Sequence, residues 1–429
     1  MLIEFSIANF RSFREKQTLS MVAASRLKKL VNVFQPKVTG EKFPSLLKVV
    51  AIYGPNASGK SNLIKALNVV PLICRRKPSA QPQRLPIAPF RFDPDLQDQS
   101  SRFELHFIHG GVRYLFELAA TADRIHEEKL VSYPKGKEEL LYQRSYRHGV
   151  DEYVFGEFLE GGKDLHHAWR KLTGPQALFL AQAVANSNEE LTQLKGPFRW
   201  LADGAMVVDD GMLSLASIAQ RLVADAPRFG DEVASLLHDV DVPISEIKVK
   251  VVDDSPNVGE GGQVSDFDEA MKAEPKAVES RLRVKTTLTH KTSLGVADFD
   301  FDEESEGTKS IFGFALPWVV LRANVDDTDR ILIVDELDSS LHPKVVEALI
   351  ERHVNAKDPC QLIFTTHDTH LMDTKLLRRD QIWMTERDAA GATQLRSVHD
   401  FEGREGEDIE KRYYEGRYRG LPFVRKGDV

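Results

Sequence analysis

Residues 47–67, LKVVAIYGPNASGKSNLIKAL, decide the fold of this chain. The continuous apolar run at 47–53 ends in a glycine, which predicts a buried strand of a parallel sheet. The run NLIKAL at 62–67 predicts the helix that follows. Between them, GPNASGKS at 54–61 has the glycine, lysine and serine spacing of a phosphate-binding loop, which joins a strand to a helix in this way.

The residue types of this loop suit an anion. Gly54 and Gly59 allow the backbone to curl, so that successive amides and the helix N-terminus face the anion. Lys60 adds a positive charge, and Ser61 is placed to coordinate Mg²⁺. An ordinary glycine turn at the start of a helix is the alternative, and the flanking strand and helix make it the weaker interpretation.

A second apolar strand, ILIV at 331–334, ends in two acidic residues. Ligands bind at the carboxyl edge of an open parallel sheet. We therefore expect Asp335 to hold Mg²⁺ through its water shell and Glu336 to polarise an attacking water. A helix cap would also explain two acids here, but their occurrence together with the phosphate loop favours chemistry.

A third strand, QLIFT at 361–365, is followed by Thr366, His367 and Asp368. This order places a histidine at the same edge of the sheet, where its imidazole could reach the γ-phosphate of a nucleotide. A histidine at a strand end is more often structural. The other motifs favour a functional role for His367.

The segment SEGTKS at 305–310 precedes a predicted helix. Ser305 and Gly307 would leave hydroxyl and backbone donors at the N-terminus of that helix, which predicts a second anion-binding end. A simple helix cap is the alternative and, without context, the more frequent role of such a sequence.

Elsewhere the hydrophobic pattern changes along the chain. Period-two runs from about 102 to 160 predict an antiparallel sheet, and helical spacing from about 165 to 238 predicts a helical insertion. Residues 253–275, rich in Gly, Asp, Glu and Pro, lie between two strand-like runs and predict a hairpin tip. The prolines of 71–89 predict an extended surface connection without a helix. After 305, helices and strands alternate, which indicates a parallel sheet covered by helices.

The composition is that of a globular chain, with 42% hydrophobic residues, 28% charged residues and a formal net charge of −8. The apolar stretches are shorter than the roughly 20 residues of a membrane helix, and the N-terminus lacks the pattern of a signal peptide. We therefore expect a cytoplasmic protein without a membrane partner.

Cys74 and Cys360 are too few for a disulfide framework or a cysteine-based zinc site. The acidic balance gives no bulk attraction to nucleic acid, although a local basic patch (Arg75, Arg76, Lys77 and Arg84) could supply one.

In this order, the motifs resemble those of the ATP-binding-cassette (ABC) class of ATPases. The branch concerned contains chromosome-structure proteins, double-strand-break repair ATPases and OLD-family proteins. GPNASGKS resembles the Walker A motif, ILIVDE (331–336) resembles Walker B, and SEGTKS resembles a signature motif that departs from the usual Leu-Ser-Gly-Gly. LDSSLHP (337–343) resembles the D-loop, and TTH (365–367) resembles the switch-histidine segment. The candidates for the Q-loop glutamine are Gln81, Gln83, Gln97 and Gln99.

The resemblance implies a fold, cofactors and a site. The fold is an α/β ABC-class P-loop ATPase head with a mixed sheet, an antiparallel β subdomain and a helical and hairpin insertion, and the cofactors are ATP and Mg²⁺. Lys60, Glu336 and His367 would be catalytic, and Ser61 and Asp335 would be the metal ligands. The nucleotide-binding residues that it implies are Arg11 (from IANFRSF, 7–13), Gly54, Asn56, Ser58, Gly59, Lys60, Ser61, Asn62, Ser305, Gly307 and Asp338.

A closer resemblance covers both ends of the chain. MLIEFSIANFRSFREKQTLSM (1–21) and YYEGRYRGLPF (413–423) resemble single-chain OLD-like ATPases of bacterial abortive-infection and anti-phage systems. Several of these are encoded beside a separate Toprim-like nuclease or other effector, as in PARIS-type two-gene systems. The segment after His367 is shorter than the roughly 100 residues of a separate domain. The acids of DFDFD (298–302) are better interpreted as one face of an edge strand than as a nuclease metal site.

We therefore expect an ATP-binding and ATP-hydrolysing switch that forms a homodimer or a higher homo-oligomer around ATP. It would control a separately encoded effector such as a Toprim-like nuclease. An SMC-like ATPase acting directly on DNA is the alternative, and the nucleotide-binding subunit of a transporter is a third possibility. The insertion argues against a transporter subunit, and the lack of a long heptad arm argues against DNA tethering. The expected domains are an N-terminal ATPase lobe (1–100), its antiparallel sheet (101–165), the insertion (166–295) and a C-terminal ATPase lobe (296–429).

Overall fold

The computed structural model divides into two compact units. The first comprises Met1–Asp209, Leu321–Asp338 and His342–Val429, and the second comprises Asp210–Val320 and Ser339–Leu341. The structure describes residues 1–76, 84–208, 215–216, 219–220, 223–224, 228–239, 242–253, 282–322, 330–339, 341–357 and 360–421.

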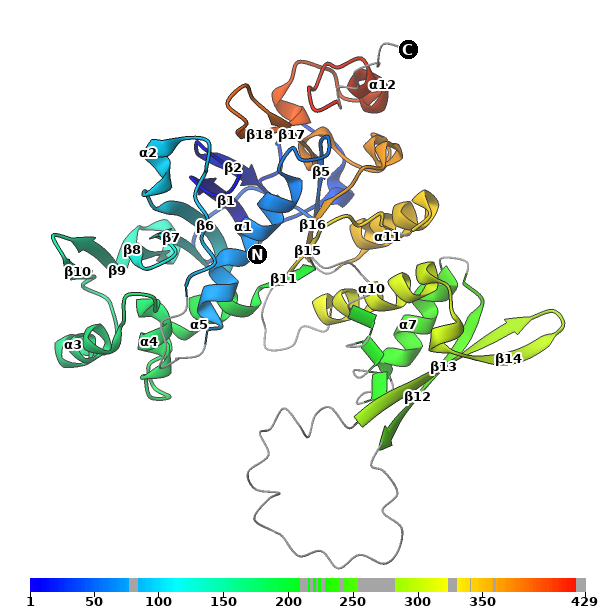
Figure 1. Cartoon of the computed structure of the whole chain (residues 1–429), viewed down its shortest axis with the longest axis horizontal. Coiled ribbons are helices and arrows are strands. Elements are labelled where there is room, and N and C mark those ends of the chain that lie inside the picture. The colour runs from blue at the N-terminus through cyan, green and yellow to red at the C-terminus, as the bar shows by residue number, and fades with distance from the viewer. Residues whose placement is uncertain are drawn as a thin grey trace, which may run out of the picture. The chain divides into compact units, whose positions relative to one another are not determined.

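A six-stranded sheet organises the first unit (Figure 1). In spatial order its strands are β11 (Ala205–Val208), β15 (Ile331–Val334), β16 (Gln361–Thr365), β5 (Val49–Tyr53), β17 (Ile382–Arg387) and β18 (Thr393–Ser397). The strands from β11 to β17 run parallel, and β18 is antiparallel to β17. Every residue of β5, β15 and β16 is buried. Burial on both faces explains why these strands are nearly continuous apolar runs in the sequence.

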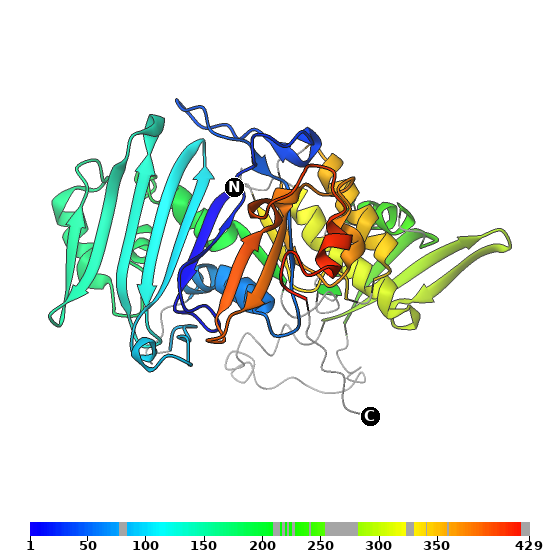
Figure 2. The ribbon, with the colours of Figure 1, turned by 90° about the horizontal axis from the view of Figure 1, so that it is seen from above.

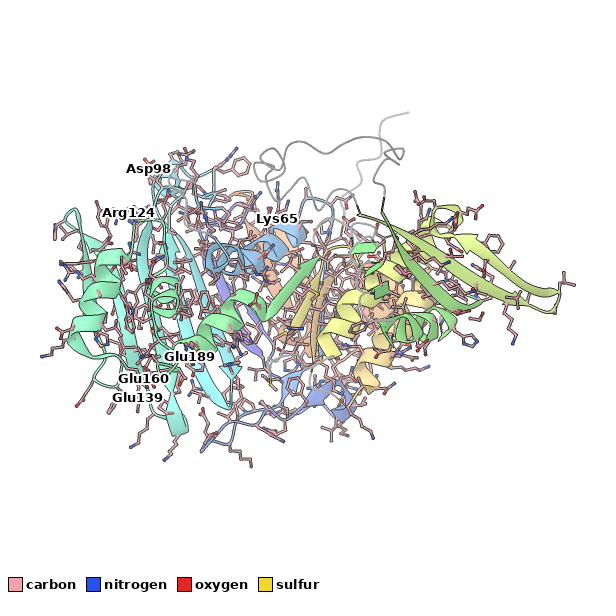
Figure 3. All side chains as sticks on the ribbon, turned by 90° about the horizontal axis from the view of Figure 1, so that it is seen from below. Lys65, Asp98, Arg124, Glu139, Glu160 and Glu189 are labelled. Atoms are coloured by element: carbon pink, nitrogen blue, oxygen red, sulfur yellow. The ribbon has the colours of Figure 1, made fainter. Side chains whose placement is uncertain are left out.

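A seven-stranded antiparallel sheet forms the other layer of this unit (Figure 2). In spatial order its strands are β10 (Val150–Phe155), β9 (Glu139–Arg147), β8 (Ile125–Tyr133), β7 (Val112–Ala120), β6 (Ser101–His109), β1 (Leu2–Ala8) and β2 (Gln17–Ser20). Asp98 and Arg124 lie toward one end of its strands, and Glu139 and Glu160 lie toward the other (Figure 3). Because β1 pairs with β6, the expected segments 1–100 and 101–165 share one sheet.

Helix α1 (Lys60–Cys74) contributes to a hydrophobic cluster that also contains residues of both sheets. Leu63 and Ile64 of the helix, Ile52 of β5 and Phe107 of β6 are all members of this cluster and are fully buried. Each such side chain stabilises the fold by roughly 1.5–3 kcal/mol relative to exposure. The phosphate-loop helix is therefore fixed firmly within the first unit.

The prediction that 71–89 contains no helix is wrong for 71–74, because α1 continues to Cys74. Pro71 lies in the last turn of the helix, where its missing N–H removes one hydrogen bond. Pro71, Ile73 and Cys74 are buried, and this burial offsets the cost. From Arg84 to Pro89 the chain forms no helix or strand, as predicted, and residues 77–83 lie outside the described part.

The other elements of the first unit flank these layers. They are β3 (Val33–Phe34), β4 (Leu46–Leu47), α2 (Pro94–Gln97), α3 (Gly162–Leu172), α4 (Phe179–Ala185), α5 (Lys195–Asp203), α11 (Pro343–Asn355) and α12 (Ile409–Tyr414). Glu128 of β8 joins α4 to the antiparallel sheet: its carboxylate accepts hydrogen bonds from the N–H groups of Phe179 and Leu180 and from the hydroxyl of Tyr142. Burial raises the pKa of Glu128, and Arg144 and these donors oppose the rise.

The second unit contains a three-stranded antiparallel sheet in the order β12 (Ile244–Asp253), β13 (Leu282–Thr292) and β14 (Gly295–Asp300). Among its described residues are helix α7 (Arg228–Asp239) and most of helix α10 (Glu306–Arg322). β14 is an edge strand and contains the first three residues of DFDFD. The sheet therefore agrees with the edge-strand interpretation of this segment. The predicted hairpin tip, apart from Asp253, lies outside the described residues.

The mixed and antiparallel sheets form the α/β architecture expected from the sequence. The boundaries between the two compact units, however, differ from the boundaries of the expected domains. Helices α3, α4 and α5 belong to the first unit, although they fall within 166–295 or begin just before it. The predicted domain boundaries remain a proposal. Among the described residues, no helix is long and apolar enough to span a membrane.

Candidate functional site: a phosphate loop facing acidic strand ends

The motif-bearing strands end at the same level. Val334 of β15 pairs with Phe364 of β16, and Thr365 of β16 pairs with Ile52 of β5. The residues that follow each strand therefore emerge at one edge of the sheet, the carboxyl edge where ligands bind in folds of this type. This register brings the phosphate loop, Asp335 and His367 to a common edge.

Threonines from the two neighbouring strands support the phosphate loop. Thr385 of β17 shares a 2.6 Å hydrogen bond with the Ser58 hydroxyl, and Thr393 of β18 donates to the Ser58 carbonyl at 2.8 Å. Gly54 and Gly59 have φ values of 152° and 113°. A Cβ at Gly54 would collide with Thr385, and one at Gly59 would collide with Thr393. Both the backbone conformation and the close approach therefore require glycine.

Lys60 begins α1 and is only 6% exposed. Its ammonium group donates to the carbonyls of Gly54 at 2.8 Å and Pro55 at 3.2 Å, which holds it under the loop. Burial lowers the pKa of Lys60, and the negative charges of Asp335, Glu336 and Asp338 oppose this shift. The lysine is thus close enough to the acids at the ends of β15 to interact with them electrostatically.

Asp335 and Glu336 follow β15 with different surroundings. Asp335 is half-buried, and its Oδ1 accepts a 2.6 Å hydrogen bond from the Thr365 hydroxyl. Glu336 is exposed, and its φ of 53° is rare for a residue other than glycine. Asp335 is the more constrained carboxylate, and Glu336 is the one that solvent reaches.

The D-loop and the switch-histidine segment contact each other. The N–H of His367 donates to Asp338 Oδ2 at 3.2 Å. The His367 side chain is exposed at the sheet edge. The described contacts bring His367 and Asp338 together, and they leave the imidazole accessible to a ligand.

Arg11 is exposed, and its backbone has a φ of 51°. The neighbouring Ser12 connects this turn to the phosphate loop, because its hydroxyl accepts a hydrogen bond from Asn62 Nδ2 at 2.9 Å and shares a second one, 2.8 Å long, with the Thr393 hydroxyl. The predicted residue Asn62 therefore belongs to one network with Ser12 and the loop, and Arg11 precedes Ser12 in the chain.

The remaining members of the predicted Walker A set lie in the loop and in the first turn of α1. Asn56 is exposed at the loop tip, and Ser61 is partly exposed in the first turn of α1. Mg²⁺ is usually held by one or two carboxylates together with phosphates and waters. Among the described residues, no group of three or more His, Cys, Asp or Glu side chains could hold a metal ion. A metal held by Ser61, Asp335 and a phosphate requires no such group.

Ser305 and Gly307 lie in the second unit, at the start of α10. The Ser305 hydroxyl accepts a 3.1 Å hydrogen bond from the Thr308 N–H, so Ser305 caps the helix. The cap is compatible with an anion site, because the other N–H groups of the first turn could face a ligand.

Two of the Q-loop candidates are fixed by local contacts. Gln97 donates to the Arg91 carbonyl and Gln99 donates to the Asp95 carbonyl, both around α2. Gln81 and Gln83 lie outside the described residues. The structure thus assigns no Q-loop glutamine.

Sequence reasoning missed the threonines that shape this site, namely Thr365, Thr385 and Thr393. It also missed that the C-terminal segment lies against the phosphate loop: a Cβ at Gly420 would be 3.9 Å from the Gly54 Cα. The Tyr413 hydroxyl donates to the Gly420 carbonyl at 3.0 Å and holds this segment in place. The resemblance of residues 413–423 was the only sequence signal for this contact.

The fold and the site define a P-loop nucleotide-binding protein of the α/β class. A family model described as "AAA domain, putative AbiEii toxin, Type IV TA system" matches residues 49–373. The chain belongs to this family, and the α/β P-loop fold class expected from the sequence is confirmed.

Two solved structures are similar at low sequence identity. One is titled "Crystal structure of the SmcHead bound to the C-winged helix domain of ScpA", with 11% identity, a TM-score of 0.44, and coverage of 92% of this chain and 97% of that chain. The other, "SMC head domain from Thermotoga maritima", has 14% identity, a TM-score of 0.41, and coverage of 92% and 98%. No curated protein matches the sequence.

Proposed function

We propose that this chain is an ATP-binding and ATP-hydrolysing switch that dimerises around ATP and controls a separately encoded effector, such as a Toprim-like nuclease in anti-phage defence. The observation that carries the proposal is the common edge of β5, β15 and β16. There the Lys60 cation lies within electrostatic range of Asp335, Glu336 and Asp338. A buried cation beside a curled glycine loop, with acids near enough to affect its charge, suits a polyphosphate accompanied by a divalent metal.

In this proposal each side chain has a defined task. Lys60 and the loop amides bind the phosphates, and Ser61 and Asp335 hold Mg²⁺, which neutralises developing charge on the phosphate oxygens. Glu336, exposed at the edge, orients and polarises the attacking water. His367 contacts the terminal phosphate.

The remaining residues of the proposed site line the nucleotide rather than react with it. They are Arg11, Gly54, Asn56, Ser58, Gly59, Asn62 and Asp338 of one chain and Ser305 and Gly307 of a second chain. The capped helix start at Ser305 supplies N–H donors that could bind a nucleotide held by the phosphate loop of another chain. A homodimer, or a higher homo-oligomer, would use both sets on one nucleotide.

A mixing experiment tests this shared site. Lys60→Ala and Ser305→Arg proteins should each be inactive in ATP hydrolysis, whereas a mixture should recover activity. The mixed dimer contains one site with both changes and one site with neither, and the homodimers contain no intact site. The measurement is the ATPase rate against the mixing ratio, with subunit exchange followed by energy transfer between labelled chains.

Each single variant incubated at the same total concentration is the control, and circular dichroism checks that Ser305→Arg is folded. Absence of recovery despite proven subunit exchange would mean that the site is contained within one chain. In that case the dimeric part of the proposal fails, and ATP binding by the first unit remains.

The proposed effector is supported by the resemblance of both chain ends to OLD-like defence ATPases and by the family description, which names a toxin–antitoxin system. We expect the product of the neighbouring gene to co-elute with this chain, and the amount to change when ATP replaces ADP. Size-exclusion chromatography with quantitative mass spectrometry measures this. Equal co-elution of an unrelated control protein, or no nucleotide dependence, would remove the effector from the proposal.

Direct action on DNA remains the second candidate, but no described contact favours it. Within the basic patch, Arg75 pairs with Asp203 at 3.4 Å and Arg84 pairs with Asp123 at 3.2 Å. Pairing with acids reduces the positive potential that phosphate backbones require.

A further inference from the structure

The hydroxyl of Thr365 contacts both acidic residues of the β15 end. Thr365 is the last residue of β16 and is 0% exposed. Its Oγ1 donates to Asp335 Oδ1 at 2.6 Å and accepts from the Glu336 N–H at 2.7 Å. One hydroxyl on the neighbouring strand therefore touches the side chain of the first acid and the backbone of the second.

These two hydrogen bonds fix each other's direction. A threonine hydroxyl has one proton and two acceptor sites, whereas a backbone N–H can only donate. Because the Glu336 N–H occupies an acceptor site, the Thr365 proton is available for the Asp335 carboxylate. This bond to a charged acceptor is the stronger kind and fixes the plane of the carboxylate.

The backbone of Thr365 adds a third contact to the same turn. Its carbonyl accepts from the Leu337 N–H at 3.0 Å. Glu336, between the two anchored residues, has a φ of 53° in the left-handed region, which L-amino acids other than Asn and Asp seldom adopt. The contacts from Thr365 on both sides of Glu336 therefore hold a backbone conformation that glutamate does not favour.

We propose that Thr365 is a positioning residue for the two acids: through its hydroxyl it orients the Asp335 carboxylate toward the metal and sets the direction in which Glu336 leaves the strand. The inference rests on the proposed ATPase function. Outer partners of metal-binding carboxylates commonly matter in this way, because a misoriented ligand binds its metal weakly. A purely structural threonine would only satisfy the Glu336 N–H.

Thr365→Val tests the inference, since valine has nearly the same shape, suits a buried strand and lacks only the hydroxyl. We expect the Mg²⁺ or Mn²⁺ concentration for half-maximal binding to the protein–ATP complex to rise roughly 10- to 100-fold, the usual range for a lost outer partner. ATP affinity measured in EDTA should stay within about twofold, since no phosphate contact is removed. Mn²⁺ titration followed by electron paramagnetic resonance reports metal binding, and a fluorescent ATP analogue reports nucleotide binding.

Two further variants separate positioning from packing. Thr365→Ser keeps the hydroxyl and should restore metal affinity to near the wild-type value. Thr289→Val is the matched control, because the Thr289 hydroxyl donates to Asp298 Oδ1 at the same 2.6 Å, on a strand of the second unit that carries none of the nucleotide motifs. It should leave metal affinity unchanged. If Thr365→Val does not fold, Thr365→Ala, which imposes no branched side chain, takes its place.

The outcomes distinguish the inference from the proposed function. Metal and nucleotide affinities of Thr365→Val equal to those of Thr289→Val would overturn the positioning role while wild-type ATP binding stands. Failure of Thr365→Ser to restore metal affinity would likewise assign the effect to packing. If the wild-type protein itself shows no metal-dependent ATP binding, the proposed function fails, and the inference fails with it.

Discussion

Glu336→Gln is expected to bind ATP with near wild-type affinity and to hydrolyse it roughly 100- to 10,000-fold more slowly, the range for loss of a general base. Glutamine keeps the size of the side chain and can adopt the same backbone conformation. The lost group acts mainly on the attacking water, so the transition state loses more than the bound state. The measurements are the single-turnover hydrolysis rate and the dissociation constant of an ATP analogue.

The control for this variant is Glu351→Gln, which removes an exposed carboxylate of α11 outside the motifs and should hydrolyse ATP normally. A population of protein with trapped, uncleaved ATP should accumulate in Glu336→Gln alone. Wild-type turnover by Glu336→Gln would mean that another acid polarises the water, and Asp338, which also interacts with Lys60, would be the next residue to examine.

The phosphate loop was predictable because its information is local. Gly54, Gly59 and Lys60 lie within one strand–loop–helix unit, so their spacing in the sequence determines their spacing in space. The glycine conformations at Gly54 and Gly59 agree with this prediction. The acids after β15 and the histidine after β16 were predictable for a similar reason, since parallel strands bring their carboxyl ends to one edge.

The supporting contacts were not predictable, because they join residues far apart in the chain. Thr393 is 335 residues from Ser58, and Thr385 is 327 residues from it, yet both bond to that serine. The sheet order places β16 between β15 and β5, and only this order lets Thr365 reach both acids. Hydrophobic patterns identify strands but carry no information about which strand lies beside which.

Pro71 shows a different limit of sequence reasoning. A proline normally ends a helix, and the cluster of later prolines favoured that interpretation. The helix continues through Pro71 because the last turn of α1 is buried in a hydrophobic cluster that consists largely of residues from other elements. Tertiary packing of this kind overrides local preference, and it becomes visible only when the partner strands are placed.

The second large effect is expected for Lys60→Ala, which should weaken ATP binding by roughly 100-fold or more, because the proposed contact of the ammonium with the phosphates is lost and a charge-assisted hydrogen bond contributes about 1.5–3 kcal/mol. Lys60 is buried under the loop, and the acids around it are left without their cation. Those acids would then repel the phosphates of the nucleotide. Isothermal titration calorimetry with a non-hydrolysable ATP analogue measures the change in affinity.

Lys65→Ala is the matched control, because Lys65 is exposed on the same helix, and this variant should bind ATP like the wild type (Figure 3).

The Lys60 ammonium also donates to the carbonyls of Gly54 and Pro55, so the loop itself could lose order in Lys60→Ala. Lys60→Met separates these effects, since it fills the buried space without the charge. Weak binding by both Lys60 variants with unchanged thermal stability assigns the loss to the missing charge. Unchanged ATP affinity in a folded Lys60→Ala protein would remove this loop from the nucleotide site, and the acids at the ends of β15 would then need another cation to explain their position.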